Sequence, residues 1–223
     1  MTIAVFDFCD TLVNLQSANS FVSFCFKDKD FKKESRYLSK LIFGFITLKL
    51  VNDFFDKFFS KHNFSKKMHL YALKGISLER LLLLAKKYYD VILSNHFNKE
   101  IINILEGHIQ KGHIVIVASG GYDLYLQYFK EQFCIDYLIC TKLKFNGCIS
   151  AGVIEGEDCL GIVKLQRVKD YIDENYTENV STIVYTDSYS DFPILCWADE
   201  AVVISKNSTQ IWPNKYKFKE IVI

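Results

Sequence analysis

The feature that most constrains this chain is a short apolar segment, Ile3 to Phe6, that runs directly into a carboxylate at Asp7. Its β-branched and aromatic residues are typical of a strand that is buried inside a parallel sheet. Asp7 would then lie at the carboxyl end of that strand, where open α/β sheets bind their ligands. Because an unpaired buried carboxylate is costly, the segment predicts both a fold class and a functional aspartate.

The remaining sequence supplies partners for this strand. With 223 residues, 50% of them hydrophobic, the chain is long enough for one domain with a full core and a modest insertion. We expect helices between the strands, two of which cover 99–110 and 165–175, and an α/β fold, a Rossmann-like doubly wound parallel sheet. The expected strands are 2–7, 114–118, 137–140, 182–186 and 201–204.

A long stretch between the first two strands lacks the pattern of strands. We interpret residues 15–96 as an inserted bundle of helices, and residues 1–14 together with 97–223 as the main domain. The many Phe and Tyr side chains of the insertion are favoured as bundle core, although contact of a few with an apolar substrate stays open. Helix-length periodicity is present in 20–26, 31–45, 51–62 and 78–92.

Three further motifs follow the first strand. One is an apolar run that ends in a serine and two glycines, one is a lysine, and one is an apolar run followed by two aspartates four residues apart. Glycines let backbone amides approach an anion closely, and a lysine can balance its charge. Together with the segment that ends at Asp7, these make four motifs, and four motifs in one chain indicate a function far more strongly than any one of them. The three motifs are 115–121, Lys164 and 184–191.

Together with Asp7 and Thr11, these motifs occur in the order found in phosphatases of the haloacid dehalogenase superfamily. The chain resembles that superfamily, and most closely its phosphoserine-phosphatase-like branch, over 2–13 and 113–204, including a hairpin-like stretch at 136–156. The resemblance implies an α-helical cap inserted after the first strand. It also implies a phosphoric monoester hydrolase in which Asp7 attacks phosphorus and forms an aspartyl-phosphate.

The resemblance also implies a Mg²⁺ site. Asp7 and Asp187 would each give a carboxylate oxygen, and Cys9 would give its backbone carbonyl, which are ligands that Mg²⁺ prefers. Asp191 would support the metal site and the lysine, on the same face as Asp187 if Ser190 caps the following helix.

Phosphate binding is implied for a second group of residues. Ser119 ends the second strand, and Gly120 and Gly121 would present backbone amides to the phosphoryl oxygens at the start of a helix. Lys164 would balance the charge beside Asp7 and the transferring group.

The first motif departs from the family pattern at Cys9, where active members usually have an aspartate that serves as general acid and base. Asp10 follows, but side chains alternate in an extended segment, which directs Asp10 away from the face that Asp7 and Cys9 share. We favour Asp10 as a turn residue, because Asp tolerates a left-handed backbone, and keep open that it replaces the missing acid.

Loss of such an acid slows a reaction by about 10²- to 10⁴-fold without abolishing binding. Three outcomes therefore stay open: a substrate with a good leaving group, a phosphoenzyme that favours transfer to an acceptor, or recruitment of Asp10. Phosphotransferase activity and a non-catalytic phosphate-binding role are the alternative functions.

Gln16 bears on the substrate, because phosphoserine phosphatases carry at this position a glutamate that pairs with the substrate amine. Glutamine lacks that charge, so we expect a small phosphorylated metabolite such as a sugar phosphate, with a lipid phosphate left open.

The charge, the cysteines and the apolar stretches of the chain bear on its partners and its location. The net charge of +1 gives no reason to expect nucleic acid as a partner. The seven cysteines include no Cys-x-x-Cys pair, which favours a reducing, cytoplasmic location. The longest apolar stretch, 41–51, is too short to span a bilayer, so we expect no transmembrane segment, and a surface contact with a membrane stays open.

Overall fold

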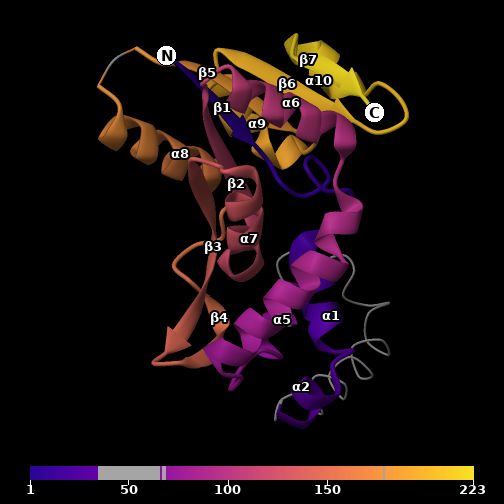
Figure 1. Ribbon diagram of the computed structural model, residues 1–223. Coiled ribbons are helices and arrows are strands. Elements are labelled where there is room, and N and C mark those ends of the chain that lie inside the picture. Colours follow the sequence, from indigo (N-terminus) through magenta and orange to yellow (C-terminus); the bar gives the residue numbers. More distant parts are fainter. Residues whose placement is uncertain (35–65, 67–68, 178) are drawn as a thin grey trace, which may run out of the picture.

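The computed structural model describes residues 1–34, 66, 69–177 and 179–223. Its centre is a seven-stranded sheet in the order β4-β3-β2-β1-β5-β6-β7 (Figure 1). Neighbouring strands are parallel, except that β3 and β4 form the antiparallel hairpin expected at 136–156. The strands are β1 (Thr2–Phe6), β2 (Ile114–Tyr122), β3 (Tyr137–Asn146), β4 (Ile149–Glu155), β5 (Ser181–Thr186), β6 (Glu200–Ser205) and β7 (Lys219–Val222).

The helices of the described residues all lie between β1 and β7 in the chain. They are α1 (Ser17–Cys25), α2 (Lys29–Glu34), α5 (Leu78–Val91), η1 (Leu93–His96), α6 (Lys99–Gln110), α7 (Asp123–Phe133), α8 (Gly161–Asn175), η2 (Tyr189–Asp191), α9 (Phe192–Trp197) and α10 (Ile211–Tyr216). No helix within the described ranges combines the length and the apolar character needed to cross a bilayer.

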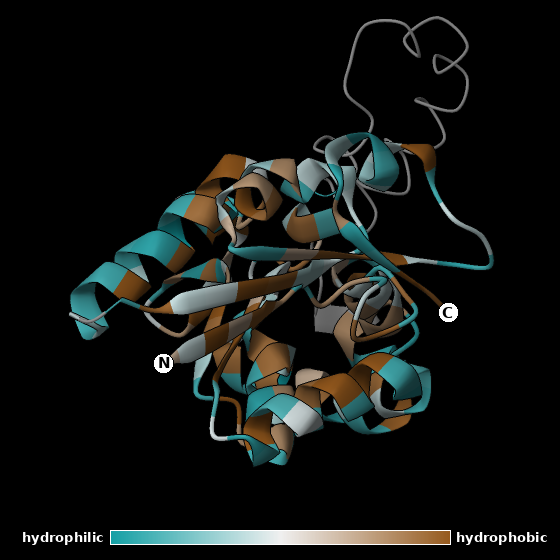
Figure 2. Ribbon diagram, turned by 90° about the horizontal axis from the view of Figure 1, so that it is seen from above, coloured by the Kyte–Doolittle hydropathy of each residue, from teal (hydrophilic) through white to brown (hydrophobic). Residues whose placement is uncertain are grey.

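Alternation of side chains along β1 explains why helices cover both faces of the sheet. Ala4 and Phe6 belong to one apolar cluster, together with buried residues of α5, α6 and α7. Ile3 and Val5 belong to a second cluster, with buried residues of α8 and α9. Figure 2 shows the result, brown strands between helices whose outer turns are largely teal. This is the α/β Rossmann-like fold that the sequence predicts, and the prediction is confirmed.

The boundaries of several elements differ from the predicted ones. The helix expected at 99–110 is α6, and the one expected at 78–92 is α5. Helix α8 begins at Gly161, four residues before its predicted start, so Lys164 lies inside it. Helix α1 begins at Ser17 instead of residue 20, and α2 includes 31–34 of the predicted 31–45, of which the rest lies outside the described residues. The predicted helix at 51–62 and the apolar stretch 41–51 lie outside the described residues.

The register of the central strands decides which residues meet at the carboxyl edge of the sheet. Phe6, the last residue of β1, pairs with Val117 of β2 on one side and with Tyr185 of β5 on the other. The segments that follow β1 and β5 therefore leave the sheet side by side. Asp7 and Asp187 are the first carboxylates of these two segments.

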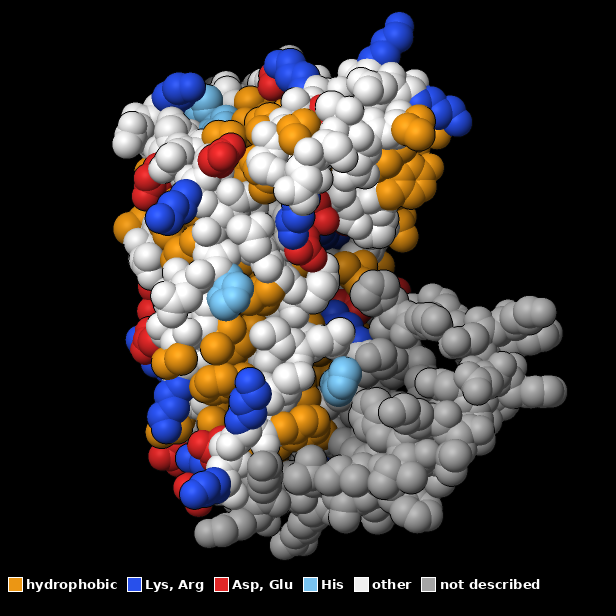
Figure 3. All heavy atoms as spheres, turned by 90° about the vertical axis from the view of Figure 1, so that its right-hand side faces the viewer, with side chains coloured by type: hydrophobic (Ala, Val, Ile, Leu, Met, Phe, Trp, Pro, Cys, Tyr) orange, Lys and Arg blue, Asp and Glu red, His pale blue; other side chains and the backbone are white. Residues whose placement is uncertain are grey.

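Acidic and basic side chains are interspersed on the face of the molecule drawn in Figure 3, among orange hydrophobic side chains. The described residues on this face therefore resemble an ordinary mixed-charge protein surface.

Candidate active site

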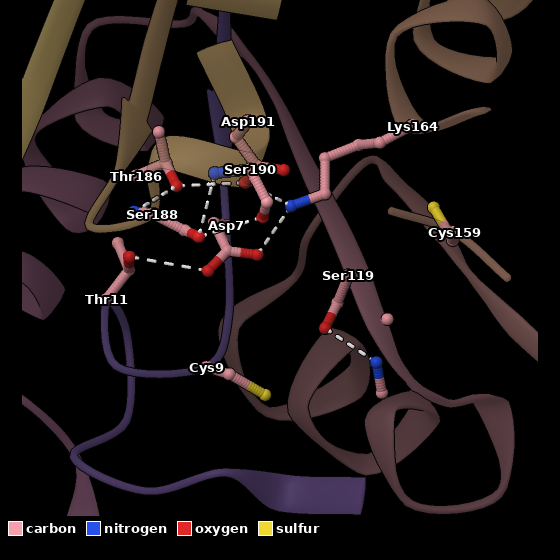
Figure 4. A network of polar contacts seen from close by, with 12 residues as sticks. Asp7, Cys9, Thr11, Ser119, Cys159, Lys164, Thr186, Ser188, Ser190 and Asp191 are labelled. Carbon is pink, nitrogen blue, oxygen red and sulfur yellow. Dashed lines mark hydrogen bonds and ion pairs between the residues drawn. The ribbon is translucent and has the colours of Figure 1, made fainter. Parts of the chain in front are cut away.

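Asp7 follows β1 directly, and its carboxylate lies at the carboxyl edge of the sheet (Figure 4). Its backbone N–H donates to the carbonyl of Tyr185 at 2.8 Å, which fixes the residue against β5. Oδ1 accepts a hydrogen bond from Lys164 Nζ at 2.7 Å, and Oδ2 lies 3.4 Å from the hydroxyl of Thr11. Burial raises the pKa of Asp7 to about 6, although Lys164 opposes that rise. The predicted nucleophile and the predicted cation are thus in direct contact.

Lys164 joins two carboxylates inside the protein. It is 2% exposed, and besides Asp7 its ammonium donates to Asp191 Oδ2, which also accepts from Thr186 Oγ1 at 2.9 Å. Burial alone would lower the pKa of Lys164, but Asp7 and Asp191 outweigh it and hold that pKa above its ordinary value. The second oxygen of Asp191, Oδ1, is buried and has no hydrogen-bond partner among the described residues. Asp191 therefore holds the lysine and keeps one acceptor unused.

Asp187 reaches the same place from the end of β5. Its backbone N–H donates to Thr11 Oγ1 at 3.0 Å, and the Thr11 hydroxyl lies 3.1 Å from Asp187 Oδ1. Burial raises the pKa of Asp187 to about 7, and the negative charges of Asp7 and Asp10 add to the rise. A buried and a half-buried carboxylate that repel each other therefore lie around one threonine hydroxyl. A divalent cation between them would remove that repulsion.

This donor set is small. In the part of the chain that the structure describes, no three side chains of His, Cys, Asp or Glu converge as a complete metal site. The set expected from the sequence has a different make-up, because it combines the Asp7 and Asp187 carboxylates with the backbone carbonyl of Cys9. Mg²⁺ commonly keeps several water ligands and takes only one or two carboxylates from the protein. The residues present therefore fit Mg²⁺ in this manner.

Cys9 directs its side chain away from the Asp7 carboxylate, as Figure 4 shows. Its sulfur lies 3.1 Å from Ser17 Oγ and accepts the backbone N–H of Ser17 at 3.4 Å, at the start of α1. Ser17 Oγ in turn lies 2.8 Å from the hydroxyl of Tyr125. Burial raises the pKa of the Cys9 thiol to about 11, with a further contribution from Asp7. The thiol is therefore protonated at neutral pH and bound within a cluster of hydroxyl groups.

Asp10 occupies the turn after Cys9 with a left-handed backbone, φ +56°. Its two carboxylate oxygens accept hydrogen bonds from Lys206 and from the side-chain amide of Gln16. This conformation is the one that the turn interpretation of Asp10 requires. Gln16 stands at the position where the family resemblance leads one to expect a substrate-binding glutamate. Its side-chain amide instead bonds to Asp10 in this turn.

The serine and the two glycines lie inside β2, so the prediction that Ser119 ends the strand is wrong: pairing with β3 shifts after Ser119 and resumes at Tyr122. Ser119 is fully buried, and its Oγ accepts the backbone N–H of Gly121 at 2.9 Å. A Cβ atom on Gly121 would lie 2.9 Å from the hydroxyl of Tyr125 and 3.0 Å from Ser17 Oγ, so only glycine fits there. The following helix, α7, begins at Asp123, so the two glycines precede its start by three and two residues instead of forming it.

The predicted cap by Ser190 is wrong. Asp191 itself stands at the N-cap position of α9, and Ser188 accepts the N–H of Ser190 at the start of η2. The short helical turn η2 follows Asp187 and ends at Asp191, which the spacing of four residues could not reveal.

Two charged residues beside the glycines were missed by sequence reasoning. Lys66 donates to the carbonyl of Gly120 at 2.7 Å, and it binds both oxygens of Asp158, at 2.6 and 2.7 Å. Asp158 precedes α8 by three residues and so lies at the same edge of the sheet as Lys164. That position was the available signal for Asp158, whereas nothing in the sequence around Lys66 distinguishes it from its lysine neighbours.

Comparison with known proteins identifies the family of the chain. The model of haloacid dehalogenase-like hydrolases matches residues 4–195, most of the chain. The chain belongs to the haloacid dehalogenase-like hydrolase family. The predicted family membership is thereby confirmed, and with it the assignment of the chain to a family of hydrolytic enzymes.

Individual relatives of this family member lie in the phosphoserine-phosphatase-like branch, as predicted. A phosphoserine phosphatase of Streptococcus thermophilus is 27% identical over 100 residues, which is 45% of this chain and 46% of the relative. The chain thus matches less than half the length of that curated relative.

Solved structures share the fold. A protein of unknown function from Bordetella pertussis Tohama I has a TM-score of 0.78 at 16% identity, with 99% of both chains covered. A phosphoserine phosphatase in the form of a phospho-aspartyl intermediate analogue has a TM-score of 0.59 at 17% identity, covering 100% of this chain and 92% of that one.

Proposed function

We propose that this protein is a Mg²⁺-dependent phosphoric monoester hydrolase that acts on a small phosphorylated metabolite through an aspartyl-phosphate on Asp7. The observation that carries the proposal is the buried contact of Asp7 with Lys164, beside Asp187 and at the carboxyl edge of the sheet. The match to a phosphoserine phosphatase supports the choice of phosphate esters as the substrate class.

The metal would be held by the carboxylates of Asp7 and Asp187 and by the carbonyl of Cys9. The raised pKa values of the two aspartates support this assignment, since burial and nearby carboxylates disfavour their negative charge and a cation would favour it. When bound, Mg²⁺ neutralises charge on the phosphoryl group and on the carboxylate that approaches it. The unused oxygen of Asp191 is an acceptor for a water molecule of such a site.

The chain's own residues divide the remaining work. One oxygen of Asp7 attacks phosphorus, the ester P–O bond breaks, and the departing oxygen takes a proton from water. A second water then attacks the phosphorus of the aspartyl-phosphate, the bond to Asp7 breaks, and phosphate leaves with Asp7 restored as a carboxylate. Lys164 keeps Asp7 oriented and offers its charge to the phosphoryl oxygens, while Ser119 offers its hydroxyl.

Cys9 limits the leaving groups that the site accepts. A thiol that is protonated at neutral pH, and that is bound to Ser17 on the side away from Asp7, neither donates a proton quickly nor activates water. We therefore expect efficient turnover only of esters whose leaving oxygen needs little protonation, such as the anomeric phosphate of a sugar. The engagement of Asp10 by Lys206 and Gln16 supports the turn role for Asp10 and leaves the acid unreplaced.

Phosphotransferase activity is the second candidate, and the same Cys9 observation favours it. Without a base to activate water, the aspartyl-phosphate lives longer, and an acceptor alcohol competes better with water for the phosphoryl group. A cytoplasmic location belongs to the same proposal, because every cysteine of the chain is a free thiol.

Phosphate release from a broad panel of phosphomonoesters with Mg²⁺ tests the proposal. We expect turnover of sugar 1-phosphates and aryl phosphates, its loss with EDTA, and a loss of at least about 10³-fold in Asp7→Asn. Asp90→Asn, at an exposed carboxylate on α5, is the matched control and should behave as wild type. Phosphate binding without turnover in the whole panel would instead identify a non-catalytic phosphate-binding protein.

A further inference from the structure

We propose that Lys66 is a positioning residue for phosphate binding, and that it acts on Ser119 through the peptide bond between Gly120 and Gly121. The proposal rests on the proposed function, in which Ser119 contacts the phosphoryl group. Neither family resemblance nor the residues of the four motifs assigns a role to Lys66.

The peptide between the two glycines is held at both ends. Its carbonyl oxygen, on Gly120, accepts the ammonium of Lys66 at 2.7 Å, and its N–H, on Gly121, donates to Ser119 Oγ at 2.9 Å. A positive charge on the carbonyl polarises an amide and makes its N–H a stronger donor. The hydroxyl of Ser119 accepts that stronger bond, so its own proton becomes a better donor toward a phosphoryl oxygen.

Lys66 itself is fixed by several contacts. Both oxygens of Asp158 accept from its ammonium, at 2.6 and 2.7 Å, and the ammonium lies 5.4 Å from the ring centroid of Tyr122. Asp158 is held in turn by the hydroxyl of Thr141 at 2.6 Å, which accepts the N–H of Cys159 at 3.0 Å. Only 14% of the Lys66 side chain is exposed, so the ion pair is less screened by water than a surface pair. The contacts with Asp158 and Tyr122 therefore fix the ammonium of Lys66 beside the carbonyl of Gly120.

Because both residues are glycines, the orientation of the peptide between them depends on Lys66. The side chain of Leu160 packs on Gly120, where a Cβ would lie 2.6 Å from its Cδ2, so the loop has no side chain of its own with which to hold the peptide. Without Lys66, the Gly120 carbonyl loses its charged partner, and the peptide is held at one end only, by the bond from the Gly121 N–H to Ser119 Oγ. That bond is then weaker and less fixed, so the hydroxyl of Ser119 is a poorer donor toward a phosphoryl oxygen.

The test compares Lys66→Gln and Lys66→Arg, with Lys86→Gln as the matched control. Lys86 is also a lysine that is paired with an aspartate, Asp90, but both partners are about half exposed on α5. We expect Lys66→Gln to raise the Kd for inorganic phosphate with Mg²⁺, and the KM for 4-nitrophenyl phosphate, by about fivefold to tenfold, with kcat changed less than about twofold. Lys66→Arg keeps charged donors for Gly120 and should stay within about twofold of wild type, as should Lys86→Gln.

Three results would overturn the proposal: an unchanged phosphate Kd in Lys66→Gln, an equal loss in Lys66→Arg, or an equal loss in Lys86→Gln. Asp158→Asn, which weakens the anchor of Lys66 without touching it, should raise the phosphate Kd in the same direction and by less.

Amide hydrogen exchange separates this proposal from the proposed function. We expect exchange in the Ser119 to Tyr122 peptide to be at least about tenfold faster in Lys66→Gln than in wild type, and unchanged in Lys86→Gln. If the wild type neither binds nor releases phosphate, the proposed function fails, and unaltered exchange in Lys66→Gln would remove the positioning role as well. Faster exchange in that case would support the action of Lys66 on the peptide.

Discussion

Asp7 and Asp187 both have raised pKa values, which makes the site sensitive to pH. Their pKa values, about 6 and about 7, lie above the ordinary 3.8 mainly because burial disfavours the ionised carboxylates, with further rises from the charge of Asp191 on Asp7 and from the charge of Asp7 on Asp187. The folded protein without metal therefore holds protons that the unfolded chain has released. Its free energy of unfolding falls as the pH rises from about 4 to about 7.

Mg²⁺ competes with those protons for the same carboxylates. We predict that Mg²⁺ raises the Tm more at pH 8, where both aspartates are ionised, than at pH 5, where both are largely protonated. Thermal unfolding in Mg²⁺ and in EDTA at the two pH values measures this difference. An equal or larger rise of the Tm at pH 5 would contradict the assignment of Asp7 and Asp187 as metal ligands.

Cys9 is the residue whose replacement should raise activity. Cys9→Asp puts back a carboxyl group that can donate and accept a proton, so we predict that kcat on alkyl phosphates increases by about 10- to 100-fold, within the range of general acid–base catalysis. Cys9→Ser, which restores no carboxyl group, serves as control and should give no such increase. A decrease in Cys9→Asp would show that the thiol and its contacts with Ser17 suit the native substrate.

Asp10 provides the complementary comparison. Because its carboxylate bonds to Lys206 and Gln16, we predict that Asp10→Asn changes kcat by less than about threefold, far below the loss expected for a general acid. Steady-state kinetics on a sugar phosphate measure this change in kcat. A loss of about 10²-fold would assign the acid to Asp10 after all.

The element that matters most for the site is the irregular end of β2 before α7. We predict that Gly121→Ala lowers the free energy of unfolding by about 1–3 kcal/mol, because a methyl group there meets Tyr125 and Ser17. Gly107→Ala in α6 is the matched control, since open space surrounds Gly107 and alanine favours a helix by about 0.5–1 kcal/mol. Urea unfolding measures the free energy of unfolding of both variants, which should fall in Gly121→Ala and rise in Gly107→Ala. Loss of stability in both, or in neither, would show that the close approach at Gly121 does not matter.

Strands and amphipathic helices were predictable from this sequence, because their residues repeat with the period of the element. The helix at 99–110 follows directly from such a period, and the strand before Asp7 follows from a continuous run of apolar residues. The end of β2 was not predictable at the same level, because the shift at Ser119 depends on pairing with β3. Strand β7 was also missed, because its four residues form a strand only beside β6.

The whole molecule brings together residues that are far apart in the sequence, and here the sequence alone reached its limit. That Asp7 and Asp187 lie close together was predictable because parallel strands end at one edge of the sheet, whereas the place of Lys164 beside them was implied by the family resemblance. The pairing of Lys66 with Asp158 and Gly120 depends on how the segment before α5 approaches that edge, which no local pattern encodes. The limits of the cap, 15–96, stay a prediction.

The central claim is that Asp7 carries the phosphoryl group, and trapping that group tests it most directly. The protein is mixed with a turned-over phosphomonoester and Mg²⁺, quenched, and reduced with borohydride, which converts an aspartyl-phosphate to homoserine, and its peptides are then analysed by mass spectrometry. We predict homoserine at position 7, with none in the absence of Mg²⁺ or in Asp7→Asn. Turnover with aspartate intact at position 7, or with the label at another residue, would contradict the account.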